Sequence, residues 1–331
     1  MYLEHFGLRE RPFSSAPDSR FVYLGEQHQR ALGYLLQSAQ ARGGIAHLTG
    51  ASGVGKTTMC RMLLNRLPER VDVALILNPV LSPAELVAVV CDELAVARGT
   101  DAPTLSALGD ALHRRQAACS GELRTVVIVD DAQRLGLDVL EHVDRLSDLA
   151  IGGKKLLQII LVGEPGLVEL LARPAPHRSS PPTAAGYHLL SFAESETCAY
   201  VRHQIALAGG GRGIFDVDAL RDVHRLSAGV PRLINTICAR ALLTAVAQRR
   251  HSVDLSTVRA AARAVLAPAG GPAIESREEA ARIETVTIPE ETAPSPAARA
   301  RRPLWPWLVG GGLILNAGAI GAAFLGPRPP D

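Results

Sequence analysis

The sequence predicts an α/β protein with a parallel sheet, followed by a smaller all-helical domain. Short apolar runs alternate with helical patterns in the first part of the chain, as in a parallel sheet that is covered by helices on both faces. After about residue 191 the strand pattern ends and only helical patterns follow. The four apolar runs are residues 43–50, 71–79, 125–131 and 154–163. The helices of the second part are expected near 192–208, 216–227, 231–248 and 254–266.

Local signals justify individual helices. A helix is expected over about 55–67, directly after the first apolar run. The sequence SPAE at 82–85 is a capping box with proline at the first helical position, and it predicts a helix that continues to about residue 96. The sequence SFAE at 191–194 predicts a second capping box, at the start of the helical domain.

Composition argues against nucleic acid as a specific partner. The chain has 331 residues, with 35 basic against 33 acidic side chains and a formal charge of +2. A DNA-binding protein usually shows a basic stripe, and only a short arginine run at 299–302 is found here. Aromatic residues make up 4% of the chain, too few for a series of base-stacking platforms. The histidines and cysteines show no zinc-finger spacing.

An uncharged apolar segment at 304–325 predicts one transmembrane helix near the C-terminus. As a helix it would measure about 33 Å, enough to cross the hydrocarbon core. Trp305 and Trp307 stand at one end, directly after the basic run, which predicts a cytoplasmic N-terminal body. The alternative is a buried helix of a soluble core. The preceding segment is rich in Pro, Ala and Glu and predicts a flexible linker. The expected organisation is an α/β domain at 1–190, a helical domain at 191–266, a linker at 267–303, a span at 304–326 and a tail at 327–331.

The sequence GASGVGKTT at 50–58 predicts a phosphate-binding loop, or P-loop, for ATP. It matches the pattern G-x-x-x-x-G-K-T and stands between an expected strand and an expected helix, which is the context that this loop requires. Its glycines let backbone N–H groups approach phosphate oxygens at the positive end of the helix. Lys56 is expected to reach the β- and γ-phosphates, and Thr57 to hold Mg²⁺. The expected binding residues are Gly50, Ala51, Ser52, Gly53, Val54, Gly55, Lys56, Thr57 and Thr58.

Two aspartates end the third predicted strand region, at 125–131. Asp130 stands where a Walker B carboxylate would hold Mg²⁺. Asp131 is the candidate base that positions the attacking water, although aspartate is one methylene shorter than the usual glutamate. The alternative for Asp131 is an N-cap of the next helix.

Two further residues are catalytic candidates. Glu164 follows the fourth apolar run, and the carboxyl ends of parallel strands line the ligand crevice. It is expected to contact the water or the γ-phosphate, and the alternative is a role in the loop alone. Arg232 begins a helix of the helical domain, where it could fold over the γ-phosphate or remain a surface arginine.

Six stretches together resemble the ExeA/GspA family of AAA+ ATPases, which belong to the general secretion pathway, with relatives in pilus and exosortase loci. The resemblance implies a P-loop domain with a helical lid, ATP and Mg²⁺ as ligands, a homo-oligomer and a span in the bacterial inner membrane with the ATPase in the cytoplasm. It also supports the assignment of Arg232 to the γ-phosphate. The stretches are 6–32, 49–68, 126–135, 146–174, 187–205 and 227–243.

The sequence departs from this family at several positions. Asp131 replaces the usual glutamate, and Glu164 stands where the family has glutamine. In the stretch 173–189 prolines replace a helix that usually carries an arginine finger, which leaves Arg178 as a candidate. The five residues after Gly326 give no support for direct peptidoglycan binding.

Three functions follow from these observations. The first is a membrane-tethered AAA+ ATPase that binds and hydrolyses ATP and supports assembly or regulation of an envelope export system, with a protein partner at the inner membrane. The alternative is an ATP-binding switch or scaffold with little hydrolysis, which the departures at Asp131, Glu164 and 173–189 motivate. A DNA-transaction ATPase is a third reading, opposed by the charge balance and the expected span.

Overall fold

A computed structural model describes most of the first 266 residues. No helix in this part of the chain is long and apolar enough to cross a membrane. The predicted linker, span and tail, at 267–303, 304–326 and 327–331, lie outside the described residues, as does Arg178. The described residues are 2–14, 19–41, 43–77, 79, 81–96, 104–119, 123–173 and 186–266.

Five parallel strands form one sheet in the order β2–β3–β6–β1–β7. Four of them confirm the predicted apolar runs. The fifth, β7, pairs with the edge of β1 and was not predicted, because its four residues carry no apolar alternation. The strands are β1 (Gly44–Gly50), β2 (Val71–Ile76), β3 (Arg124–Val129), β6 (Gln158–Gly163) and β7 (Gly186–Leu189).

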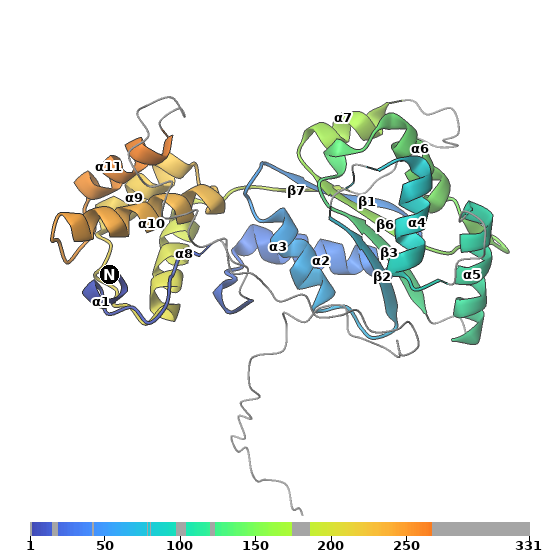
Figure 1. The fold of residues 1–331 in the computed structure, drawn as a ribbon, viewed down its shortest axis with the longest axis horizontal. Helices are drawn as coiled ribbons and strands as arrows, with labels where there is room; N and C mark the ends of the chain where they lie inside the picture. The colour runs from blue at the N-terminus through green and yellow to red at the C-terminus, as the bar shows by residue number, and fades with distance from the viewer. Residues whose placement is uncertain are drawn as a thin grey trace, which may run out of the picture. The chain divides into compact units, whose positions relative to one another are not determined.

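Helices cover both faces of this sheet (Figure 1). Alternate residues of β3 explain this, because Val126 and Ile128 join one apolar cluster while Val127 and Val129 join the other. The first cluster lies under α2 (Glu26–Gln40) and α3 (Lys56–Leu64). The second lies under α4 (Pro83–Glu93), α5 (Leu105–Ala118), α6 (Leu137–Ser147) and α7 (Gly166–Ala172).

The last predicted strand begins later than expected. Lys154 and Lys155 form β5 (Lys154–Lys155), which pairs antiparallel with β4 (Ala150–Ile151) in a separate two-stranded hairpin. The buried strand β6 starts only at Gln158. The exposed lysines therefore belong to a separate hairpin that precedes β6.

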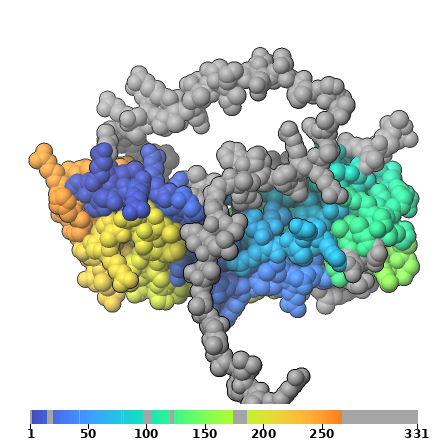
Figure 2. Space-filling view, turned by 90° about the horizontal axis from the view of Figure 1, so that it is seen from below, coloured from blue at the N-terminus to red at the C-terminus, as the bar shows by residue number. Residues whose placement is uncertain are grey.

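Four helices with a core of their own follow the sheet, in the regions where helices were predicted. They are α8 (Glu194–Leu207), α9 (Val217–Ser227), α10 (Pro231–Ala247) and α11 (Leu255–Leu266). Residues from the start of the chain complete this core: α1 (Tyr2–His5) contacts α10, η1 (Ser19–Phe21) contacts α8, and Leu8 and Phe13 are buried in it. Figure 2 shows the dark-blue N-terminal residues against the yellow and orange helical residues.

One of the two predicted capping boxes is confirmed. Ser82 Oγ accepts from the Glu85 N–H, while the Glu85 carboxylate accepts from the Ser82 N–H. The predicted box at 191–194 is wrong. Helix α8 begins two residues later than that box requires, and the Ala193 N–H donates instead to Glu196 Oε2 at 3.0 Å. The second oxygen of Glu196 accepts from the backbone N–H at the start of α2.

Candidate nucleotide site

The predicted phosphate loop connects β1 to α3. Two of its glycines, Gly53 and Gly55, have φ values of 81° and 106°, which L residues rarely adopt. Gly50 is required for space, since a Cβ there would lie 2.6 Å from the carbonyl oxygen of Leu189 on β7. The loop therefore turns sharply between the carboxyl end of a buried strand and the first turn of a helix. This arrangement suits an anion, because the N–H groups of the first helical turn lack intrahelical partners.

Lys56 lies across this loop. Its Nζ donates to the carbonyl oxygens of Gly50 at 2.9 Å and Ala51 at 3.0 Å, and only 7% of the residue is exposed. The ammonium group is thus held at the inside of the turn, where it could move from these carbonyls to phosphate oxygens. The other loop residues differ in exposure: Ala51, Ser52 and Thr57 are exposed, Thr58 is half-buried and Val54 is buried.

Four further predicted site residues surround Lys56 electrostatically. Burial is the largest influence and lowers the pKa of Lys56 below its ordinary value of 10.5. The carboxylates of Glu164, Asp130 and Asp131 oppose this shift, in that order, and the Arg232 guanidinium adds to it. The structure therefore brings Lys56, the three acids and Arg232 close enough to influence one another, although they come from four different segments.

The predicted magnesium ligands are in direct contact. Thr57 Oγ1 donates to Asp130 Oδ2 at 2.6 Å, and Asp130 is 4% exposed. A hydroxyl and a carboxylate are oxygen ligands of the kind that Mg²⁺ takes together with substrate phosphates. Among the described residues, no three His, Cys, Asp or Glu side chains gather into a metal site. Thr57 and Asp130 would therefore hold Mg²⁺ in company with nucleotide oxygens and water.

Asp131 does not cap a helix with its side chain. It has φ 52° and precedes the short η2 (Ala132–Arg134), without a side-chain capping bond. The next α-helix, α6, has Gly136 as its N-cap. Asp131 therefore occupies the N-cap position of η2, as the alternative expected, but its carboxylate makes a different contact. Gln133 Nε2 donates to Asp131 Oδ1 at 3.4 Å.

Gln133 also reaches Glu164, and the sequence analysis missed this residue. The Glu164 N–H donates to Gln133 Oε1 at 3.0 Å. One glutamine thus joins the ends of the adjacent strands β3 and β6. Its position three residues after Asp130 was the only signal in the sequence, and without the sheet order that spacing does not identify a contact.

The helical domain meets the phosphate loop at Arg232. Its backbone N–H donates to Gly53 O at 3.3 Å, and its side chain is exposed. The preceding turn requires Gly229, which has φ 71° and whose Cβ would lie 2.0 Å from Phe192 O. The Phe192 N–H donates to Gly229 O at 2.9 Å. These contacts place the start of α10 beside the loop, as the prediction for Arg232 requires.

His28 is a second residue that the sequence analysis missed. This buried ring lies within hydrogen-bonding distance of the P-loop, with Nε2 3.0 Å from Val54 O, and it packs against Phe192 with ring centroids 4.8 Å apart. Burial lowers the pKa of His28, and the hydrogen bond to Val54 and the charge of Glu196 oppose that shift. His28 therefore supports the loop from α2.

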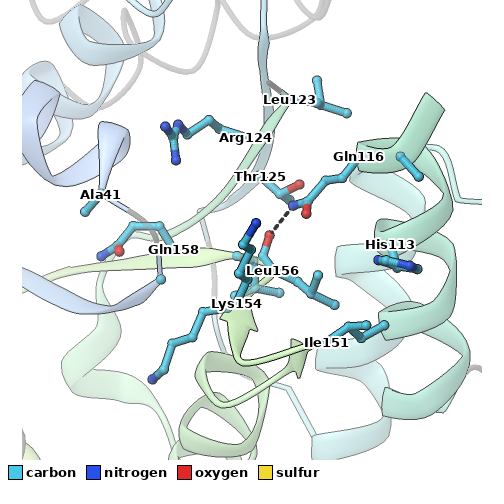
Figure 3. Close-up of a pocket in the computed structure, with 14 residues that line it drawn as sticks. Ala41, His113, Gln116, Leu123, Arg124, Thr125, Ile151, Lys154, Leu156 and Gln158 are labelled. Carbon is cyan, nitrogen blue, oxygen red and sulfur yellow. Dashed lines mark hydrogen bonds between the residues drawn. The ribbon is translucent and has the colours of Figure 1, made fainter. Parts of the chain in front are cut away.

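A cavity of about 210 Å³ lies beside the amino ends of the strands, at the end of the sheet opposite the P-loop (Figure 3). Its lining includes Arg124 and Gln158, the first residues of β3 and β6, whereas Asp130 and Glu164 follow the other ends of these strands. Among the residues that the structure describes, Arg124, Lys154 and Lys155 line it and no acidic residue does. The cavity is therefore separate from the P-loop and contributes nothing to that site.

Comparisons with known proteins agree with this geometry. The AAA domain family matches residues 39–171. The general secretion pathway protein A of Aeromonas hydrophila is 42% identical over 255 residues, which are 76% of this chain and 46% of that protein. The chain thus spans about half the length of this relative.

Solved structures show the same fold at low identity. Cdc6p from Pyrobaculum aerophilum has a TM-score of 0.58 at 18% identity, covering 76% of this chain and 72% of that one. The ORC2 protein of Aeropyrum pernix in its ADP form has a TM-score of 0.55 at 17% identity, covering 76% and 71%. The family match at 39–171 includes the P-loop and Asp130, and the match to the relative extends over three quarters of the chain. The chain belongs to the ExeA/GspA family of AAA+ proteins.

Proposed function

We propose that this protein binds ATP with Mg²⁺ and hydrolyses it, in support of the assembly or regulation of an envelope secretion system. The convergence of Lys56 with Glu164, Asp130, Asp131 and Arg232 carries the proposal. A cation inside a phosphate loop, two Mg²⁺ ligands and two further carboxylates are the set that phosphoryl transfer to water needs. Residues 1–190 form the ATPase domain in this proposal, and 191–266 form its lid.

Each residue has a defined task in the reaction. Lys56 leaves the carbonyls of Gly50 and Ala51 and binds the β- and γ-phosphates. Asp131 orients the attacking water and accepts its proton as the water oxygen bonds to the γ-phosphorus and the bond to the ADP oxygen breaks. Glu164 contacts the water or the γ-phosphate from the next strand.

The metal and the lid add charge to the site. Thr57 and Asp130 would hold Mg²⁺, which would supply positive charge against the phosphates. The Arg232 side chain swings over the γ-phosphate. This movement is possible because the Arg232 backbone already contacts the loop while its side chain is exposed. Bound ATP thereby draws the helical lid and the ATPase domain together.

The cellular setting rests on the relative of the general secretion pathway. We propose that the protein is held at the bacterial inner membrane by a single span at 304–326, with the ATPase domain in the cytoplasm. The linker at 267–303 then passes the nucleotide state to a secretion-system protein, and copies of the chain associate with one another. The likeness to Cdc6p and ORC2 at 17–18% identity concerns the fold alone and does not favour DNA as a ligand.

One observation favours a second candidate function, an ATP-binding switch with little hydrolysis. The candidate base is an aspartate, and its carboxylate is already engaged by Gln133 at 3.4 Å. Aspartate is one methylene shorter than the usual glutamate, so the carboxylate reaches less far towards a water on the γ-phosphate. The switch would then bind ATP, order its lid and release it unchanged.

Steady-state hydrolysis by the full-length chain, measured beside a nucleotide-binding titration, separates these functions. Lys56→Ala should abolish both binding and turnover. Lys154→Ala is the matched control, because this exposed lysine belongs to the β4–β5 hairpin, at the end of the sheet opposite the P-loop. Binding without turnover in the unmodified chain supports the switch. Turnover that survives in Lys56→Ala contradicts both functions.

A further inference from the structure

Gln133 makes two bonds of different kinds at the centre of the candidate site. Its Nε2 donates to Asp131 Oδ1 at 3.4 Å, and its Oε1 accepts from the Glu164 N–H at 3.0 Å. The orientation of the amide is dictated by its neighbours, since a backbone N–H needs an acceptor and a carboxylate needs a donor. An uncharged amide supplies both from one side chain. Glutamate could satisfy Glu164 but would repel Asp131.

The packing around Gln133 leaves little freedom. A Cβ on Gly163 would lie 2.6 Å from Gln133 Oε1 and 3.2 Å from its backbone nitrogen. Gly163 is the last residue of β6, and β6 pairs with β3, the strand that leads into Asp130. The glutamine therefore fits a space that a glycine keeps open between the ends of two adjacent strands.

We infer that Gln133 is a positioning residue that sets the separation between the carboxylate of Asp131 and the backbone of Glu164. Aspartate is shorter than glutamate by one methylene, so Asp131 reaches less far towards a water on the γ-phosphate. A bond from Gln133 fixes the direction of this short side chain, and the bond to Glu164 ties it to the neighbouring strand. A long bond without ligand is compatible with this role, because such bonds tighten when substrate binds.

This inference rests on the proposed hydrolysis, and it makes a specific kinetic prediction. In the full-length chain, Gln133→Ala should lower kcat by about 10- to 100-fold, since misplacement by about 1 Å can cost about 100-fold. The dissociation constant for ATP should stay within about twofold of the value for the unmodified chain, which is a small change in binding free energy. The reason is that the loop and Lys56 are untouched. Gly163→Ala should act in the same direction, because the added methyl displaces Gln133.

Two variants separate positioning from mere support of the fold. Gln133→Glu keeps an acceptor for the Glu164 N–H but loses the donor to Asp131, so kcat should fall while hydrogen exchange around Glu164 stays slow. Gln133→Ala should lower kcat and also speed that exchange. Gln116→Ala is the matched control. This glutamine of α5 donates to Leu156 O at 2.7 Å beside the cavity, at the end of the sheet opposite the P-loop (Figure 3).

The outcomes distinguish this inference from the proposed function. An unchanged kcat in Gln133→Ala overturns the inference, and so does a joint loss of kcat, ATP affinity and melting temperature. If the unmodified chain binds ATP without turnover, the proposed hydrolysis fails by itself. Hydrogen exchange at the Glu164 N–H then tests whether Gln133 holds this backbone. Faster exchange in Gln133→Ala but not in Gln133→Glu supports the inference, and equal exchange in all variants overturns it.

Discussion

Thr57 Oγ1 donates to Asp130 Oδ2 at 2.6 Å, which joins the first turn of α3 to the end of β3. These two residues are separated by 73 positions in the sequence, and Asp130 is almost fully buried. The contact holds the phosphate loop against the strand that carries the acidic pair. It also leaves both oxygens where a cation bound to ATP phosphates would meet them.

Asp131 should be required for hydrolysis but not for binding. Asp131→Asn removes the proton acceptor without changing the shape of the side chain, so turnover should fall by about 10²- to 10⁴-fold while ATP affinity is retained. Asp131→Glu keeps the carboxylate and extends its reach, and it should retain activity. Turnover and equilibrium binding measured on the same samples check this. Equal turnover in the asparagine variant and the unmodified chain would remove Asp131 from the reaction.

Gly53→Ala should damage both the loop and its contact with the lid. The residue has φ 81°, and an added Cβ would lie 2.8 Å from the Cβ of Arg232. Strain of about 1 kcal/mol from the backbone adds to this clash, and ATP affinity should fall with it. Thermal melting and an ATP titration provide the measurement. Gly33→Ala is the control, because a Cβ at this position in α2 meets nothing within 4 Å.

ATP affinity should decrease at alkaline pH earlier than for an ordinary lysine. Burial lowers the pKa of Lys56 below 10.5, so the charged form is lost as pH rises through that lowered value, and its attraction for phosphate is lost with it. Titrations between about pH 7 and pH 10 test this. In Lys56→Arg the ATP affinity should not change over this pH range, whatever its absolute value, because the guanidinium stays charged. A flat profile in the unmodified chain would count against the burial of Lys56.

Asp222 should stabilise the helical domain. Its buried carboxylate accepts from Arg225 Nε at 2.7 Å and Arg259 Nε at 3.0 Å, joining α9 to α11. Asp222→Asn should cost about 1–3 kcal/mol, since these bonds involve charged groups. Asp218→Asn is the matched control, because Asp218 on the same helix is 77% exposed and its pair with Arg221 contributes little. Chemical denaturation of both variants at neutral pH gives the comparison.

The contribution of Asp222 should also depend on pH. The hydrogen bond from Arg225, assisted by Arg259, lowers the pKa of Asp222 in the folded protein. The folded state therefore binds this proton less readily than the unfolded state. The stabilisation is complete above the ordinary carboxylate pKa of 3.8 and is lost as pH falls through the lowered value. The difference between Asp222→Asn and the unmodified chain should shrink on acidification, and a constant difference would contradict this assignment.

The sequence alone determined the features that depend on neighbouring residues. Four strands were predicted from their apolar runs, because a strand buried on both faces needs an unbroken apolar stretch. The loop around Lys56 was predicted because glycines at fixed spacing are the residues that can make this turn. The capping box at Ser82 was confirmed for the same reason, since both of its bonds are local.

Only the tertiary structure decided which distant residues meet. Strand β7 pairs with β1, although its own residues show no strand pattern, because pairing at a sheet edge depends on the partner. His28 lies 26 positions from Val54, and Gln133 lies 31 positions from Glu164, so neither contact is visible in any local pattern. Leu8 and Phe13 likewise fill the helical core from the other end of the chain. Local chemistry identified the groups of the site, whereas chain folding decided how they are held, since hydrogen bonds and packing act through space and not along the sequence.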